Sequence, residues 1–253
     1  MALAPGLVAG VVLGVVLVAV GLPLVGVVAL VVVAAGVSMW IWRTAPGLVV
    51  RSIGARPSDE TDHPRLHNLV DGLCATMGLP RPAVYVVESA VPNALAVGHD
   101  PESAMLVVTS GLEQSLSLVE LEGVLAHELV HIKRHDTVVA AVAVLTTVPW
   151  SLIRGDAAGA ERVHRLMGPG REFSADQRAA VVVRYPPGIG SALETMVDRE
   201  GSAPPSAWPP GNGRAAPLTR WLWIDPMVGE SAVGPAEGNL DDTRVRAAAQ
   251  ALL

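Results

Sequence analysis

The first 42 residues are almost entirely hydrophobic, whereas hydrophobic and polar residues alternate along the rest of the chain. Two apolar runs, at about 5–20 and 24–42, flank Gly21-Leu22-Pro23 and contain no Asp, Glu, Lys or Arg. The second run is long enough for a membrane-spanning helix of about 20 residues, and the first would form a thin or tilted span. Because Pro23 suits a turn or the first position of a helix, the pattern predicts a transmembrane anchor at 1–45, built as a helical hairpin.

A single span with a re-entrant start and a secretory signal are the alternatives for this region. The signal is disfavoured because no basic residue precedes the apolar run. Gly6, Gly10 and Gly14 recur every four residues, a spacing that lets helices approach closely in lipid. Small residues are also common in membrane spans in general, so the spacing alone does not decide between the alternatives.

The end of the anchor carries the residues expected at a membrane surface. Trp40 and Trp42 fit an interfacial aromatic belt, and Arg43, Arg51 and Arg56 follow them. Because basic residues accumulate on the cytoplasmic side of membrane spans, the sequence predicts a multi-pass protein of the cell membrane whose body faces the cytoplasm. A lipid membrane is therefore an expected partner.

Residues 46–253 show the changing hydrophobic periods of a mixed α+β domain. Apolar residues that recur every three or four positions predict helices, and short apolar runs between turn residues predict strands. A proline-rich stretch at 203–217 predicts a loop. The predicted helices are 59–78, 117–135, 172–183, 189–197 and 241–253, the predicted strands are 82–87, 94–97 and 105–109, and a further apolar helix is expected at 137–153. The expected fold is a mainly helical domain with a small β-sheet.

The composition limits the functions that this domain can have. A net charge of −6 and a pI near 5.6 argue against nucleic-acid binding. Cys74 is the single cysteine, so neither an internal disulfide nor a cysteine-based zinc knuckle can form. A reducing cytoplasm is compatible with this cysteine content.

The peptide His127-Glu128-Leu129-Val130-His131 lies inside the predicted helix 117–135, whose start carries the capping-box residues Ser117 and Glu120. Positions i and i+4 share one face of a helix, so both imidazoles can bind one zinc ion. Glu128 is offset around the helix and is placed to act as a general base. Two histidines that only cap or pack a helix are the alternative interpretation.

A catalytic zinc ion usually has three protein ligands and one open position. The metzincin extension of the motif is missing, because Arg134 and Thr137 stand where it needs Gly and His. Glu172 and Asp176 are four residues apart and share a helical face, so one carboxylate could bind the metal while the other accepts the outer N–H of a ligating histidine. A solvated acidic face is the alternative.

These motifs resemble the HtpX-type membrane metallopeptidases, a family that also includes the CAAX-prenyl proteases. The similarity covers about residues 58–200 well and the rest loosely. The residues that carry it are Val124–Ile132 with Asp136 (similar to the zinc helix), Glu172–Asp176 (the third-ligand motif), Asn93–Gly98 (a strand beside the cleft), Val108–Leu112 (the next strand and turn) and, weakly, Trp223–Pro226 and Arg244-Val245.

The resemblance implies a gluzincin-like fold and a zinc-dependent endopeptidase at the membrane, often acting in membrane-protein quality control. It implies that Glu128 is the catalytic base and that an extended protein or peptide substrate adds to a strand edge beside the cleft. The residues it assigns are His127, His131 and Glu172 as Zn²⁺ ligands, Asp176 behind them, and Asn93, Ala94, Leu95 and Ala96 at the substrate. A strand-start turn residue is the alternative for Asn93.

The chain also departs from the family pattern. Gly238-Asn239-Leu240-Asp241 stands where the family usually has a His-Pro, and one apolar run, 137–153, stands where many members have two. With 17 residues this run is at the short limit for a span. A single crossing would place Glu172 on the opposite side of the membrane from His127, so the run is predicted to lie in the membrane interface or to pack against the anchor.

Several roles stay open at this stage. Arg244, His135 and Tyr185 are candidates to stabilise the oxyanion. A signalling protease of the BlaR sensor type has a similar His-Glu-Leu-x-His-Ile-Lys-Arg stretch, but no extracellular sensor domain is predicted. A non-catalytic zinc-binding membrane scaffold is disfavoured because Glu128 is present.

Overall fold

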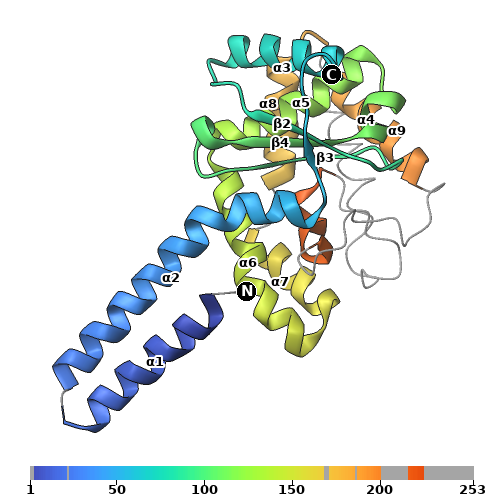
Figure 1. Cartoon of the computed structure of the whole chain (residues 1–253). Coiled ribbons are helices and arrows are strands. Elements are labelled where there is room, and N and C mark those ends of the chain that lie inside the picture. Colours follow the sequence, from blue (N-terminus) through green and yellow to red (C-terminus); the bar gives the residue numbers. More distant parts are fainter. Residues whose placement is uncertain (1–2, 22, 168–170, 186, 201–215, 225–253) are drawn as a thin grey trace. The chain divides into compact units, whose positions relative to one another are not determined.

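The computed structural model describes residues 3–21, 23–167, 171–185, 187–200 and 216–224 (Figure 1). The chain divides into two compact units, Met1–Ala45 and Pro46–Leu253. The helices are α1 (Leu3–Ala19), α2 (Pro23–Ser52), α3 (Pro64–Met77), α4 (Ser110–Ser115), α5 (Leu118–Lys133), α6 (Asp136–Arg154), α7 (Asp156–Met167), α8 (Arg171–Val182) and α9 (Pro187–Glu200), with 3-10 turns η1 (Pro101–Ser103) and η3 (Ala216–Leu222). The strands are β1 (Arg56–Pro57), β2 (Ala83–Val87), β3 (Ala94–Val97) and β4 (Met105–Thr109).

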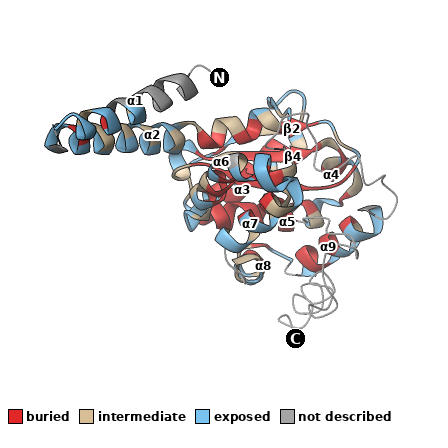
Figure 2. Ribbon diagram, turned by 90° about the horizontal axis from the view of Figure 1, so that it is seen from below, coloured by how far each residue is buried: buried red, intermediate tan, exposed pale blue. Residues whose placement is uncertain are grey.

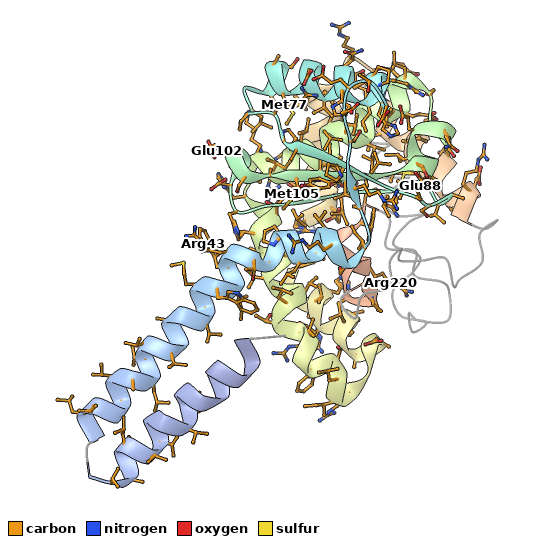
Figure 3. All side chains as sticks on the ribbon, in the orientation of Figure 1. Arg43, Met77, Glu88, Glu102, Met105 and Arg220 are labelled. Atoms are coloured by element: carbon orange, nitrogen blue, oxygen red, sulfur yellow. The ribbon has the colours of Figure 1, made fainter. Side chains whose placement is uncertain are left out.

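The N-terminal unit consists of two apolar helices that approach each other at small residues. A Cβ atom added to Gly14 of α1 would lie 2.7 Å from the Cγ of Leu30, and one added to Gly10 would lie 2.8 Å from a Cγ of Val33. Almost all the side chains drawn on these helices are hydrocarbon up to Arg43 (Figure 3). Glycine at these two positions is therefore what allows α1 and α2 to lie so close together.

Among the described residues, one helix, Leu24–Ser52, is long and apolar enough to cross a membrane. The apolar stretches Gly10–Ala19 and Asp136–Val148 are shorter than this. The apolar run at 24–42 forms only part of a longer helix, because α2 continues through Pro46 to Ser52. Val49 and Val50 are buried in the second unit, and this packing outweighs the helix-breaking tendency of proline.

In the described part of the chain, four strands form one mixed sheet in the order β1-β2-β4-β3. β2 and β4 pair in parallel, while β1 and β3 run antiparallel to their neighbours. The three strands expected from the sequence are present as β2, β3 and β4, which agrees with the predicted α+β class. β1 was not predicted, because two residues are too few to show an alternating pattern.

Helix α5 lies at the centre of the second unit. Ser117 Oγ accepts a hydrogen bond from the Glu120 N–H, and a carboxylate oxygen of Glu120 accepts one from the Ser117 N–H, so the predicted capping box is confirmed. Residues 123–132 of this helix are all buried. Figure 2 shows the buried residues gathered around α3, α5 and the strands, whereas the first part of α2 is largely exposed.

Two helix boundaries differ from those predicted. The helix expected at 59–78 begins only at Pro64, because Asp59 Oδ1 accepts the N–H groups of Thr61 and Asp62 in a preceding turn. The helix expected at 117–135 ends at Lys133, and His135 has a left-handed backbone with φ of 59°. The chain therefore changes direction at His135 before α6 begins.

The segment 154–171 contains α7, a helix that was not predicted from its charged and glycine-rich sequence. Its buried face is made by Gly159 and Val163. A Cβ atom on Gly159 would lie 2.8 Å from the Cβ of Ser151 and 2.6 Å from a Cδ of Leu218, so the glycine permits tight packing of α7 on α6 and η3. The sequence of α7 shows no clear apolar stripe, because one of its two buried positions is a glycine without a side chain.

The apolar run at 137–153 is helical, as predicted, and forms most of α6. It packs against α5, α7, β3 and η3 within the second unit. The other face of α6 leaves large apolar side chains exposed, namely Val139, Trp150, Leu152 and Ile153. The predicted helix at 241–253, and most of the predicted loop at 203–217, lie outside the described residues.

The contact between α5 and α9 gives a stability prediction. A Cβ atom on Gly123 of α5 would lie 2.9 Å from the backbone nitrogen of Ile189 in α9, which has little freedom to move. Gly123→Ala should therefore lower the free energy of unfolding by about 1–3 kcal/mol, the usual cost of overpacking. Gly72→Ala in α3 meets nothing within 4 Å and should raise it by up to about 1 kcal/mol through helix propensity.

The measurement is a urea titration of the purified full-length chain in detergent, followed by circular dichroism. The contact between α5 and α9 would be contradicted if the Gly123→Ala and Gly72→Ala proteins were equally stable.

Candidate metal centre

His127 and His131 stand on one face of α5, one helical turn apart. Both are buried, with relative exposures of 0% and 5%. Their rings meet edge to face, with centroids 4.8 Å apart, and their Nε2 atoms are separated by 3.1 Å. The i, i+4 spacing therefore brings two potential ligand atoms together, as the sequence predicted.

Glu172 in the first turn of α8 reaches the same point from 45 residues further along the chain. Its Oε2 lies 3.1 Å from His127 Nε2 and 3.5 Å from His131 Nε2. The packing of α8 against α5 produces this meeting. The three groups can each offer one ligand atom, and these atoms all lie within 4.8 Å of one another.

These separations fit a single zinc ion. Zinc bonds to nitrogen and oxygen are about 2.0–2.2 Å long, so two ligand atoms of a tetrahedral site lie about 3.4 Å apart. The three separations here are 3.1, 3.1 and 3.5 Å. Two imidazoles and one carboxylate also form a donor set that zinc accepts, with a fourth position left for water or substrate.

The outer nitrogen of each histidine faces a carboxylate. Asp176 Oδ1 lies 2.7 Å from His127 Nδ1, and Asp136 Oδ2 lies 3.2 Å from His131 Nδ1. A carboxylate at Nδ1 favours the tautomer whose Nε2 lone pair points inward, which is the form that binds a metal. Asp176 was expected near the ligands, whereas Asp136 had been assigned no such role. Its position five residues after His131, at the start of the next helix, was the available signal.

The carboxylates around the two imidazoles favour positive charge at this centre. Burial lowers the pKa of His127, but the charge of Asp176, helped by Glu172, outweighs burial and raises that pKa to about 9. Burial likewise opposes ionisation of Glu172, yet the charge of His131 and hydrogen bonds to both histidines hold its pKa well below the ordinary value. A cation bound between these groups would satisfy the same electrostatic demand.

Glu128 lies beside the two histidines but is not one of the three converging groups. It is 2% exposed, and burial raises its pKa even though His127 and His131 act in the opposite direction. A carboxylate with a raised pKa accepts and returns a proton near neutral pH more readily than an ordinary one. Its surroundings therefore suit a general base.

Arg171 is a further charged residue of the centre, and the sequence motifs assign it no role. Its NH2 and Nε groups donate to Glu172 Oε1 at 2.9 and 3.1 Å. One carboxylate oxygen is thus held by the arginine while Oε2 faces the histidines. The residue immediately precedes Glu172, but no helical spacing marks it in the sequence.

The predicted substrate residues lie immediately before β3 and on it, and β3 is an edge strand among the described strands and packs against α5. Asn93 is fully buried at the start of this strand, where its N–H donates to Thr109 Oγ1 and its Oδ1 accepts from the Ala94 N–H. Ala94, Leu95 and Ala96 are buried as well. Asn93 has the contacts of a residue that fixes the strand start, and its role toward a substrate stays a prediction.

The two oxyanion candidates that the structure describes, His135 and Tyr185, are not among the three converging groups. His135 does not continue the face of His127 and His131, because α5 ends before it, and its side chain is exposed. Tyr185 follows α8 and is 54% exposed. Arg244 lies outside the described residues.

The described residues combine a small mixed sheet with a buried His-Glu-x-x-His helix and a carboxylate from a later helix, an arrangement typical of domains that bind a metal ion through this motif. Residues 60–186 match peptidase family M48, and the chain belongs to this family. The resemblance found in the sequence motifs is thereby confirmed. The matched segment includes the three converging groups and Glu128.

Individual relatives agree with the family assignment. The chain is 32% identical over 191 residues to "Protease HtpX homolog" of Dictyoglomus thermophilum, which covers 63% of each protein. It is 36% identical over 174 residues to "Protease HtpX homolog 2" of Methanosarcina mazei, covering 58% of this chain and 59% of the relative. For "Protease HtpX homolog" of Tropheryma whipplei the identity is 36% over 188 residues, covering 62% and 64%. The chain thus spans about three fifths of the length of these curated relatives.

The geometry predicts which side chains would hold a metal ion. Glu172→Ala removes one of the three converging groups and should leave the purified protein with little zinc, whereas His135→Ala and Glu161→Ala should each retain about one ion per chain. Glu161 is a matched control, because it is an exposed glutamate of α7 paired with Arg165. Elemental analysis of protein purified from zinc-supplemented medium measures the stoichiometry. About one zinc ion per chain in the Glu172→Ala protein would remove Glu172 from the ligand set.

Proposed function

We propose that this chain is a membrane-anchored zinc-dependent endopeptidase with a gluzincin-like domain. The observation that carries the proposal is the convergence of His127, His131 and Glu172 on one point, beside the buried carboxylate of Glu128. The M48 family match and relatives named as proteases support it.

The proposed reaction is hydrolysis of a peptide bond. Zinc bound in such a site lowers the pKa of a water molecule to about 7 and polarises a carbonyl group. Glu128 takes a proton from the attacking water and returns it to the leaving amine, a task that suits its raised pKa. Asp176 and Asp136 keep the imidazoles oriented through Nδ1, and Arg171 holds the second oxygen of Glu172.

The proposed substrate is an extended segment of a protein or peptide. β3 is an edge strand, and such an edge can pair with an added strand through main-chain hydrogen bonds. Because this strand packs against α5, a segment paired with it would run close to the metal centre. Membrane-protein quality control is the cellular role that we propose for this activity.

The proposed membrane association rests on α2 and, secondarily, on α6. α2 has the length and hydropathy of a span, and with α1 it would form the predicted transmembrane hairpin. We place α6 on the same side of the membrane as the rest of the domain. Glu172 and His127 meet at one point, and α7, with its charged residues and 12-residue length, could not return the chain across a bilayer. The exposed Leu152 and Ile153 would lie in the membrane interface.

A catalytically inactive form gives the first test of this function. Glu128→Gln preserves all three proposed ligands and should retain about one zinc ion per chain, while hydrolysis of casein should fall by about 10²–10⁴-fold because the general base is lost. The measurement compares cleavage rates of purified, protease-free wild-type and variant proteins. Wild-type proteolysis by the Glu128→Gln protein would refute the assignment of the base.

The proposed topology is tested with reporter fusions in a bacterial host. Arg43, Arg51 and Arg56 follow the anchor, so alkaline phosphatase fused at the C-terminus should be inactive and a fluorescent protein there should fluoresce. If α1 and α2 both cross, phosphatase fused directly after Gly21 should be active. An inactive phosphatase after Gly21 would indicate that only α2 crosses. An active phosphatase at the C-terminus would indicate that the domain faces away from the cytoplasm.

A further inference from the structure

The outer edge of β3 is in contact with a later part of the same chain. β3 ends the strand order β1-β2-β4-β3, so one of its two edges faces away from the sheet. On that side the N–H of Ile224 donates a hydrogen bond to the carbonyl oxygen of Ala94 at 2.9 Å. We call residues 216–224, which comprise η3 and the two residues after it, the edge-covering segment.

The edge-covering segment is held in place by packing. Its residues Leu218, Thr219, Trp223 and Ile224 are at most 1% exposed. Trp223 Nε1 donates to Thr219 Oγ1 at 3.3 Å, which ties the end of the segment to its η3 helix. η3, on which Figure 3 labels Arg220, packs against α6 and α7, so the segment occupies the space between these helices and β3.

The covered edge is next to the metal centre. β3 packs along α5, and beyond its end Gly98 accepts a hydrogen bond from Thr137 Oγ1 at 3.2 Å. Thr137 follows Asp136, whose carboxylate faces His131. One end of the strand is thus tied to the same turn that orients a proposed zinc ligand, and the edge that a substrate would use runs beside α5.

We propose that the edge-covering segment is an internal occupant of the substrate edge, which an extended substrate must displace from Ala94 before it can pair with β3. This inference rests on the proposed peptidase function, because it assumes that β3 receives the substrate. The segment resembles the substrate that it would exclude. It donates a main-chain N–H to a strand carbonyl and places apolar side chains beside it, as an added substrate strand would.

The hydrogen bond from Ile224 predicts how strongly the segment weakens substrate binding. A main-chain hydrogen bond contributes about 0.5–1.5 kcal/mol net, so loss of the Ile224 donor should strengthen substrate binding by about 2–12-fold. Displacement of the segment would act before chemistry, so KM should fall while kcat stays close to its original value. In the competing arrangement the segment is never displaced from β3, and a substrate binds to other groups of the domain.

The variant that separates these arrangements is Ile224→Pro, which removes the N–H donor, with Ile224→Val as the matched control that keeps it. Both are made in the full-length chain that also carries Glu128→Gln, and the probe is a fluorescein-labelled casein peptide followed by anisotropy. We expect the peptide to bind about 2–12-fold more tightly to the Ile224→Pro protein than to the Ile224→Val protein. Equal or weaker binding, with the zinc content unchanged, would overturn the proposal.

Hydrogen exchange provides a second measurement that needs no change at Ile224. Addition of the casein peptide to the Glu128→Gln protein should speed exchange of the backbone amides in 216–224 if the segment is displaced. Slower or unchanged exchange there, with the peptide bound, would show that the segment stays on β3 and would refute displacement. Neither binding nor exchange requires turnover, so a failure of the proposed hydrolysis is recognised separately from a failure of this inference.

Discussion

A buried helix that carries two histidines and a glutamate needs compensating charges, and much of the second unit is arranged to supply them. His127, Glu128 and His131 are at most 5% exposed on α5. An unpaired charge at such a depth is strongly destabilising, so each polar group must face a partner or lose its charge. Asp136, Glu172 and Asp176 provide the opposite charges from the start of α6 and from α8.

This demand also restricts how the chain can be placed at a membrane. Glu172 and Asp176 reach α5 only if α6 and α7 bring the chain back to the side on which α5 lies. The apolar character of α6 favours a position in the membrane, whereas the meeting of Glu172 with the histidines excludes a single crossing by α6. An apolar helix that packs one face on the domain and leaves Trp150, Leu152 and Ile153 exposed satisfies both. Arg154 and Arg162 lie over the Trp150 ring, an arrangement that suits a polar interface.

The sequence was most informative where one local rule determines one local structure. The strands at 94–97 and 105–109, and the capping box of Ser117 and Glu120, follow from short patterns that tertiary contacts do not alter. The meeting of Glu172 with the histidines was anticipated from family motifs, since helical spacing alone cannot join residues 45 positions apart. The distances between Glu172 and the histidines depend on the packing of α8 on α5, which the sequence does not show.

The features that the sequence did not predict depend on distant contacts or on missing side chains. Asp136 became a partner of His131 because the chain turns at His135 in a left-handed conformation, which is uncommon for a residue other than glycine. α7 was missed because Gly159 makes its contacts through the absence of a Cβ atom. The contact of Ile224 with Ala94 joins main-chain groups 130 residues apart, and main-chain groups leave no trace in side-chain patterns.

The distance along the chain between the proposed ligands has a consequence for biosynthesis. Translation adds about 5–20 residues per second, so the 45 residues that separate His127 from Glu172 take about 2–9 s to synthesise. During that interval α5 can leave the ribosome without Glu172 and Asp176, while the apolar segment before residue 43 has already been made. Under the function proposed above, the nascent chain would enter the membrane before its metal site is complete, and an unfinished copy could not yet cleave a neighbouring protein.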